Sequence, residues 1–138
     1  QQAGTDRRRL MLSPPIAKAQ LYPVIANATG VLMPSRVDNY PNACLEALML
    51  GKPVIGTKES SIDEIIVDGQ TGILVENGKT DSLRQGIDRL LAMSPGQLGK
   101  MESQAALAAS AIMHEDRIGQ HIAYYEHVIS EFHRRQIL

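Results

Sequence analysis

Short apolar runs alternate along the chain with longer amphipathic stretches, and this alternation predicts a layered α/β protein. Three apolar runs of strand length lie between turn residues, at Gly30 to Pro34, Pro53 to Thr57 and Thr71 to Val75. Continuous apolar runs of this length are typical of parallel strands that are covered on both faces. A helix predicted from Pro41 to Leu50 connects the first two strands, so they form a βαβ unit with a right-handed crossover.

The segments before and between these strands have weaker patterns. Leu10 to Leu12 predicts a brief strand, and Pro14 and Pro15 then open a helix that Pro23 should kink or end. A short helix is predicted over residues 60–68. Gly51 follows the helix of the βαβ unit, where a left-handed residue is expected.

Three amphipathic helices are predicted to close the chain. The first is capped by Thr80 or Asp81, and the second begins with a cap at Ser94 and a proline in its first turn. The last runs from about Glu115 to Arg134 and has apolar residues at spacings of 4, 3, 4 and 3. These residues are Ile118, Ile122, Tyr125, Ile129 and Phe132. Such a stripe is most often a face that packs against a core.

The composition indicates one globular domain and excludes several classes of protein. The chain has 138 residues, 43% of them hydrophobic and 21% charged, with a formal net charge of −1. The weak charge and the 4% aromatic content argue against a nucleic-acid partner. No apolar run is long enough for a transmembrane segment. Cys44 is the only cysteine, which suits a reducing compartment, and we expect a cytoplasmic protein that could also lie at the inner membrane surface.

The loop that follows the first strand of the βαβ unit is the best candidate for a binding site. In an open parallel sheet, ligands bind at the carboxyl ends of strands, where a loop leads into a helix. Free N–H groups of Asn42, Ala43 and Cys44 would face such a cleft with the positive end of the helix dipole, which suits a diphosphate. Asp38 and Glu46 could hold the hydroxyls of one ligand, because a carboxylate accepts two hydrogen bonds. Alternatively, both acids only stabilise the N-terminus of the helix.

Three stretches of the chain, in this order, resemble the retaining glycosyltransferases of family four. Pro34 to Gly51 is similar to the family signature of Pro-Ser, Glu, seven residues, Glu and Ala-Met, followed by Gly. Asp63 to Val75 is similar to its Glu-Ile-Val-x-Asp-Gly-x-x-Gly-x-Leu-Val segment, and His114 to Tyr125 is similar to its closing helix. The resemblance covers about residues 10 to 132.

The resemblance implies a partial C-terminal domain of the two-Rossmann (GT-B) fold, with a parallel Rossmann-like sheet flanked by helices over residues 1–138. The first strands of this domain and the N-terminal acceptor domain would be absent, and the chain alone would be inactive. The chain begins with Gln1 rather than Met, which also suggests a piece of a longer protein. The whole enzyme would move a sugar, with retention of anomeric configuration, from a nucleotide-diphosphate sugar to a hydroxyl of a glycan or lipid-linked acceptor. The family generally needs no metal or other cofactor.

The resemblance also implies roles for the residues of the loop and the helix. Asp38 matches the first Glu of the signature, which lies by the transferred sugar and is the catalytic candidate, although its side chain is one methylene shorter. Glu46 matches the second Glu, which binds the ribose hydroxyls. The other donor-binding candidates are Asn39, Tyr40, Pro41, Asn42, Ala43 and Cys44. The first three match a loop near the sugar hydroxyls, and the last three match the helix start near the diphosphate.

Some family features have no match in the chain. Ser60 and Ser61 stand where the family usually has Gly-Gly, and Arg7 to Arg9 do not match its diphosphate-clamping Arg and Lys. In the usual strand order 3-2-1-4-5-6, two strands are missing, so either Leu10 to Leu12 fills the gap or the open edge pairs with another chain in a dimer. Two other interpretations stay open: a non-catalytic nucleotide-sugar-binding module or partner subunit, and a sugar-nucleotide epimerase.

Overall fold

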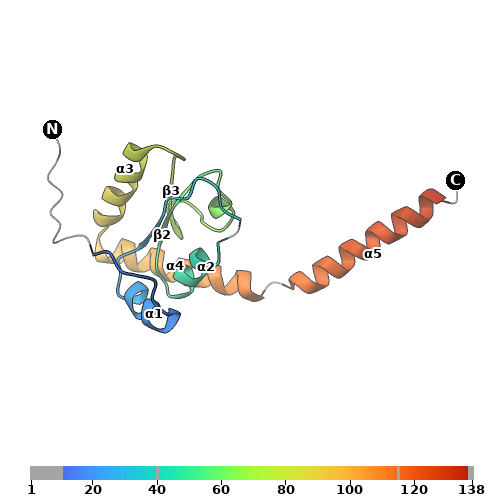
Figure 1. The fold of residues 1–138 in the computed structure, drawn as a ribbon, viewed down its shortest axis with the longest axis horizontal. Helices are drawn as coiled ribbons and strands as arrows, with labels where there is room; N and C mark the ends of the chain where they lie inside the picture. The colour runs from blue at the N-terminus through green and yellow to red at the C-terminus, as the bar shows by residue number, and fades with distance from the viewer. Residues whose placement is uncertain (1–10, 40, 115, 137–138) are drawn as a thin grey trace.

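A parallel sheet of three strands lies at the centre of the fold (Figure 1). The computed structural model describes residues 11–39, 41–114 and 116–136. The strands β1 (Val31–Met33), β2 (Val54–Thr57) and β3 (Gly72–Val75) pair in the order β1-β2-β3. Val31 pairs with Val54, and Val54 pairs in turn with Gly72. The predicted parallel sheet and βαβ unit are therefore confirmed.

Helices cover both faces of this sheet. The described helices are α1 (Lys18–Ala26), α2 (Asn42–Met49), the 3-10 helix η2 (Ile62–Glu64), α3 (Thr80–Leu91), α4 (Pro95–His114) and α5 (Arg117–Gln136). On one face, α2 and the second half of α4 form a core cluster with Val54. On the other face, α3 packs with Ile55 and Ile73, and Met101 of α4 joins this second cluster. Successive residues of β2 thus point into different clusters, as the alternation of a strand requires.

The strand β1 lies at an open edge of the sheet, and it is not covered on both faces as predicted. Leu32 is 50% exposed, and Val31 and Met33 are only half-buried. The prediction was wrong because Val31 and Met33 pack against the cluster that α2 and α4 form, whereas Leu32 points to the other face and belongs to neither cluster. In addition, no described strand pairs with the free edge of β1. Only β2, which has a partner on both sides, is buried along its whole length.

The segment before α1 differs from its prediction. Met11 and Leu12 are not in a strand and are 90% and 86% exposed, so they do not fill the gap beside β1, while Leu10 lies outside the described residues. The helix α1 also passes Pro23, because this proline removes one helical N–H only and the helix ends one turn later. The Asn27 side chain donates to the Pro23 carbonyl at 2.8 Å. The dimer through the open edge stays a prediction.

Two predicted helix starts have different outcomes. Neither Thr80 nor Asp81 caps α3, since Lys79 is the N-cap residue and makes no side-chain cap hydrogen bond. The predicted cap of α4 is confirmed, because Ser94 N–H donates to Gln97 Oε1 at 2.9 Å and Gln97 N–H donates to Ser94 Oγ at 3.4 Å. The helix predicted over residues 60–68 is reduced to η2.

The last helix, α5, extends away from the sheet (Figure 1). Its predicted apolar stripe is present, but each of the five residues is between 53% and 76% exposed. The expectation that this stripe packs against the core is therefore wrong for this chain, because no described element covers it. None of the helices in the described part of the chain is long and apolar enough to cross a membrane.

Candidate functional site

The candidate site lies at the carboxyl edge of the sheet, where residues 34–41 join β1 to the N-terminus of α2. The helix forms because Pro41 stands at its N-cap with a φ of −68° and helix-forming residues follow. It ends as predicted at Gly51, whose φ is +69°. Gly51 N–H donates to Leu48 O, and Lys52 N–H donates to Ala47 O. These contacts fix the length of α2 and thus the position of its N-terminus.

One side chain at the end of β2 and one in the loop after β3 hold Ser35 and Arg36 in place. Thr57, at the end of β2, donates from Oγ1 to the Ser35 carbonyl. Asn77 Nδ2, in the loop after β3, donates to the Arg36 carbonyl at 2.7 Å. Neither residue was predicted as part of the site, although their positions at the end of β2 and after β3 place them at the same edge of the sheet.

The two candidate acids have different partners. Asp38 is half-buried, and its Oδ1 accepts a hydrogen bond from Asn39 N–H at 2.9 Å. Glu46 lies inside α2, and its Oε1 accepts from Lys18 Nζ at 2.5 Å. This hydrogen bond and the charge of Glu46 raise the pKa of Lys18. Sequence analysis did not single out Lys18, which reaches Glu46 from the first turn of α1. Tyr40 lies outside the described residues.

The N-terminus of α2 offers fewer free N–H groups than predicted. Cys44 N–H donates to the Pro41 carbonyl at 3.0 Å, so it is not free as expected. The N–H groups of Asn42 and Ala43 have no acceptor among the described residues, and both residues are exposed. Only these two N–H groups can therefore meet a ligand together with the helix dipole.

A shallow cavity of about 190 Å³ lies next to this loop, between the ends of the strands and the start of α3. Arg36 and Lys79 contribute positive charge to its lining, and Glu76 contributes negative charge. Glu76 accepts from Lys58 Nζ at 2.7 Å, which lowers the pKa of Glu76. Lys79 forms no ion pair among the described residues, although its charge also helps to lower the pKa of Glu76. The carboxyl edge thus holds two cations beside the exposed N-terminus of α2.

Cys44 is a packing residue and cannot act as a nucleophile in this state. The residue is fully buried, and burial together with the Asp38 charge raises the pKa of its thiol to about 12. A protonated, buried thiol is inert, because the thiolate is the reactive form. The interpretation of Cys44 as a small residue that packs α2 is confirmed.

We expect Cys44 to resist alkylation by iodoacetamide at pH 9 in the folded protein and to react quickly in urea. At this pH the fraction of thiolate falls on the order of 10³-fold when the pKa rises from 9.0 to about 12. The pKa of Cys44 is higher in the folded than in the unfolded state, so its protonated thiol contributes fully to the free energy of unfolding below pH 9. This contribution is lost as the pH rises toward 12. Mass spectrometry of the labelled chain measures the rates. Equal rates with and without urea would contradict the burial of Cys44.

Ser61 holds the candidate loop from a strained backbone position. Its φ is +61°, in the left-handed region that favours glycine, and its Oγ donates to the Asp38 carbonyl at 2.9 Å. Ser61 stands where the family that the sequence resembles usually has the second Gly of a Gly-Gly pair. The serine thus adopts the glycine-like backbone and adds a hydrogen bond.

Ser61→Ala is expected to unfold at a lower urea concentration than Ser61→Gly. Both variants lose the hydrogen bond to Asp38, but only the glycine also removes strain of about 1 kcal/mol. The free energy of unfolding should therefore fall by about 1 kcal/mol for Ser61→Ala and change little for Ser61→Gly. Urea titration monitored by circular dichroism measures both values. The reverse order of the two variants would contradict the left-handed conformation.

No group of three or more histidine, cysteine, aspartate or glutamate side chains that could hold a metal ion occurs within residues 11–39, 41–114 and 116–136. The residues of the carboxyl edge instead combine the free N–H groups of Asn42 and Ala43, the candidate carboxylates of Asp38 and Glu46, and the cations Arg36 and Lys79. This set of groups suits a ligand that carries both phosphate and hydroxyl groups.

Comparisons with known proteins identify the family to which this chain belongs. The family described as "Glycosyl transferases group 1" matches residues 6–93. A D-inositol 3-phosphate glycosyltransferase from Arthrobacter sp. (strain FB24) is 32% identical over 96 residues, which are 70% of this chain and 23% of that relative. The chain therefore belongs to the group 1 glycosyl transferases, and it spans about a quarter of the length of the curated relatives that it matches.

Solved structures agree with this fold. Sucrose-phosphate synthase from Thermosynechococcus elongatus has a TM-score of 0.74 at 20% identity, over 90% of this chain and 31% of that chain. Anabaena Alr3699/HepE in complex with UDP-glucose has a TM-score of 0.62 at 21% identity, over 73% of this chain and 29% of that chain. The predicted class, a parallel sheet flanked by helices as in part of a GT-B glycosyltransferase, is confirmed.

Proposed function

We propose that this chain is the donor-binding part of a retaining glycosyltransferase, which transfers a sugar from a nucleotide-diphosphate sugar to an acceptor hydroxyl. The observation that carries the proposal is the carboxyl edge, where Asp38 precedes the exposed N-terminus of α2 and Glu46 lies within it. The membership in the group 1 family supports it. The complex of the structurally similar HepE with UDP-glucose supports a donor of this class.

Each part of the donor would meet a different group of the carboxyl edge. Glu46 would accept hydrogen bonds from the ribose hydroxyls, and the hydrogen bond from Lys18 orients its carboxylate until the donor binds. The free N–H groups of Asn42 and Ala43 would receive the diphosphate, with the positive end of α2 behind them. Asp38 would lie beside the transferred sugar, in the loop that Thr57 and Ser61 hold through the carbonyls of Ser35 and Asp38.

The reaction would not need a nucleophile from the protein. The bond between the anomeric carbon and the diphosphate breaks, and the acceptor oxygen bonds to this carbon on the same face, which retains the configuration. The acceptor proton passes to an oxygen of the leaving diphosphate. The chain would assist by neutralising the charge that develops on the diphosphate. Cys44, as a buried neutral thiol, would take no part in the step.

The charge of the diphosphate would be neutralised without a metal ion. Arg36 and Lys79 line the adjacent cavity, and the N-terminus of α2 adds a partial positive charge. Binding of the donor should therefore be the same in EDTA and in added Mg²⁺. A donor affinity that depends on Mg²⁺ would contradict this part of the proposal.

Calorimetric titration of the chain with UDP-, GDP- and ADP-sugars tests the donor site and identifies the base. We expect one of the three to bind with a stoichiometry of one, and binding of none would contradict the proposal. Proton NMR of the product then tests the reaction in the protein that carries the acceptor site. The same anomeric configuration in donor and product, for example an equatorial anomeric proton in both, supports retention, whereas binding without any transfer would support the alternative of a non-catalytic module.

A further inference from the structure

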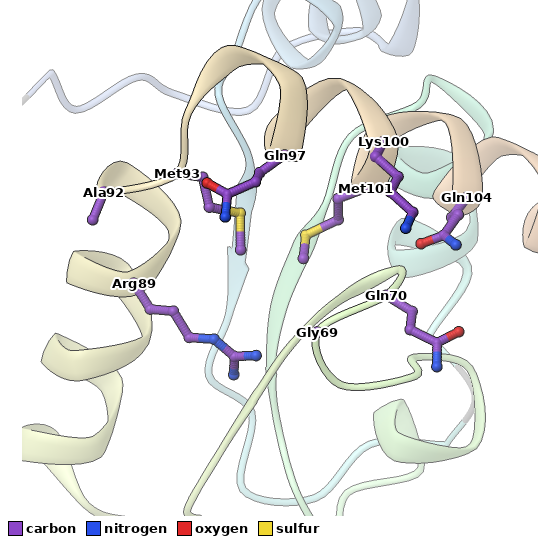
Figure 2. A pocket seen from close by; sticks show the side chains of 9 residues that line it. All are labelled: Gly69, Gln70, Arg89, Ala92, Met93, Gln97, Lys100, Met101 and Gln104. Atoms are coloured by element: carbon purple, nitrogen blue, oxygen red, sulfur yellow. The ribbon is translucent and has the colours of Figure 1, made fainter.

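A second cavity, of about 670 Å³, lies at the opposite edge of the sheet from the candidate donor site (Figure 2). It is formed by the turn before β3, the C-terminal end of α3 and the first half of α4. The turn before β3 lies at the amino end of the strand, whereas residues 34–41 follow the carboxyl end of β1. In a parallel sheet these two ends form opposite edges, so the two sites are separate.

The lining of this cavity is positively charged and rich in amides. Arg89 of α3 and Lys100 of α4 supply two cations, and no lining residue is acidic. The amides belong to Gln70, Gln97 and Gln104, and Met93 and Met101 add an apolar surface. Figure 2 shows Arg89 and Lys100 on opposite sides of the cavity, with Gln70 below Lys100. Although the whole chain has a net charge of −1, both charged residues of this lining are cations, and one of them, Arg89, is paired with Asp68.

Lys100 differs from most lysines of the chain because it has no acidic partner among the described residues. Three of the five lysines are paired with a glutamate, in the pairs Lys18–Glu46, Lys52–Glu102 and Lys58–Glu76. The remaining two, Lys79 and Lys100, each line a cavity. An unpaired lysine that faces an arginine across a cavity lined by several amide groups is suited to an anionic ligand.

Arg89 is fixed in the orientation that faces the cavity. Its Nη1 lies 3.2 and 3.3 Å from the two carboxylate oxygens of Asp68. The guanidinium also packs on the backbone of Gly69, where an added Cβ would lie only 2.8 Å from Nη2. Because Gly69 has a φ of +74° and no side chain, the guanidinium can lie close to the turn. This cation is therefore preorganised, which reduces the loss of conformational entropy when a ligand binds.

We propose that this cavity binds a small phosphate monoester that carries hydroxyl groups, such as a sugar phosphate. A dianionic phosphate has enough acceptor oxygens for both Arg89 and Lys100. The glutamine amides can donate to and accept from hydroxyl groups, and the two methionines can cover the apolar face of a sugar ring. The cavity lies within the size range of sites for small molecules, which is about 300 to 1,000 Å³.

Titration with glucose 6-phosphate, followed by amide chemical shifts in ¹H–¹⁵N NMR spectra, tests this proposal. We expect saturable shifts at Gly69, Gln70 and Lys100, and a dissociation constant that rises at least about tenfold in Lys100→Gln. Lys58→Gln is the matched control, because it removes the same charge from an exposed lysine that does not line the cavity. Lys100 is exposed, so Lys100→Gln should fold, and its spectrum reports this directly.

Further ligands test which part of the phosphate monoester is recognised. Glucose and gluconate should not bind, and inorganic phosphate should bind more weakly than glucose 6-phosphate. Equal binding of gluconate would overturn the recognition of phosphate, and equal binding of inorganic phosphate would overturn the role of the hydroxyl groups. Loss of glucose 6-phosphate binding in Glu46→Ala but not in Lys100→Gln would place the ligand at the donor site and overturn the proposal. Loss of glucose 6-phosphate binding in Lys100→Gln but not in Glu46→Ala would support the proposed cavity, even if no nucleotide sugar bound the chain.

Discussion

Glu46→Ala is expected to abolish detectable binding of the nucleotide-diphosphate sugar. If the Glu46 carboxylate accepts hydrogen bonds from two ribose hydroxyls, its removal loses two bonds to a charged group, each worth about 1.5 to 3 kcal/mol. The affinity should therefore fall by on the order of 10² or more. Isothermal titration calorimetry with the donor that the wild-type chain binds measures this change.

Two variants separate the loss of the carboxylate from the loss of its ion pair. Glu102→Ala removes a similar glutamate, because Glu102 Oε1 accepts from Lys52 Nζ at 2.7 Å, but Glu102 lies in α4 and outside the donor site. We expect this variant to bind the donor normally. Lys18→Met removes the partner of Glu46 and should change the affinity by only a few fold. Unchanged affinity in Glu46→Ala would refute the assignment of Glu46 to the ribose.

The features that the sequence predicted correctly depend on local signals. The buried strands β2 and β3, the helix α2 and its end at Gly51 follow from apolar runs, helix propensity and a glycine at the left-handed position. The cap at Ser94 depends on a glutamine three residues later. Each of these signals lies within a few residues of the structure that it specifies, so a single sequence contains it.

The features that could not be predicted depend on distant residues or on missing neighbours. Lys18 and Glu46 are separated by 28 positions, and no local pattern indicates that their side chains meet. The exposure of β1 and of the α5 stripe has another cause. An apolar pattern predicts that a face is buried, but it does not indicate whether residues of the same chain bury it. The number of free N–H groups of α2 was overestimated, because the hydrogen bond from Cys44 N–H to the Pro41 carbonyl depends on the geometry of the first turn.

Gly72 explains why one motif of the sequence requires glycine. This residue is the second glycine of Asp-Gly-x-x-Gly and begins β3, where it pairs with Val54. A Cβ at this position would lie 2.3 Å from the Val54 carbonyl oxygen and 3.0 Å from Cγ2 of Ile66. The carbonyl belongs to the buried central strand, so it cannot move without disturbing the ladder between β2 and β3.

Gly72→Ala is therefore expected to destabilise the domain by about 3 kcal/mol or more, because the added methyl group meets backbone atoms rather than a flexible side chain. Since domains of this size are stable by about 5 to 15 kcal/mol, the variant should lose much of its stability in urea titration. Gly99→Ala in α4 is the matched control, because nothing lies within 4 Å of the added Cβ. This control should be stabilised by up to about 1 kcal/mol, since alanine is the better helix former. If both variants unfolded at the wild-type urea concentration, the close approach of β2 and β3 at Gly72 would be wrong, and the glycine of this motif would need an explanation outside the fold.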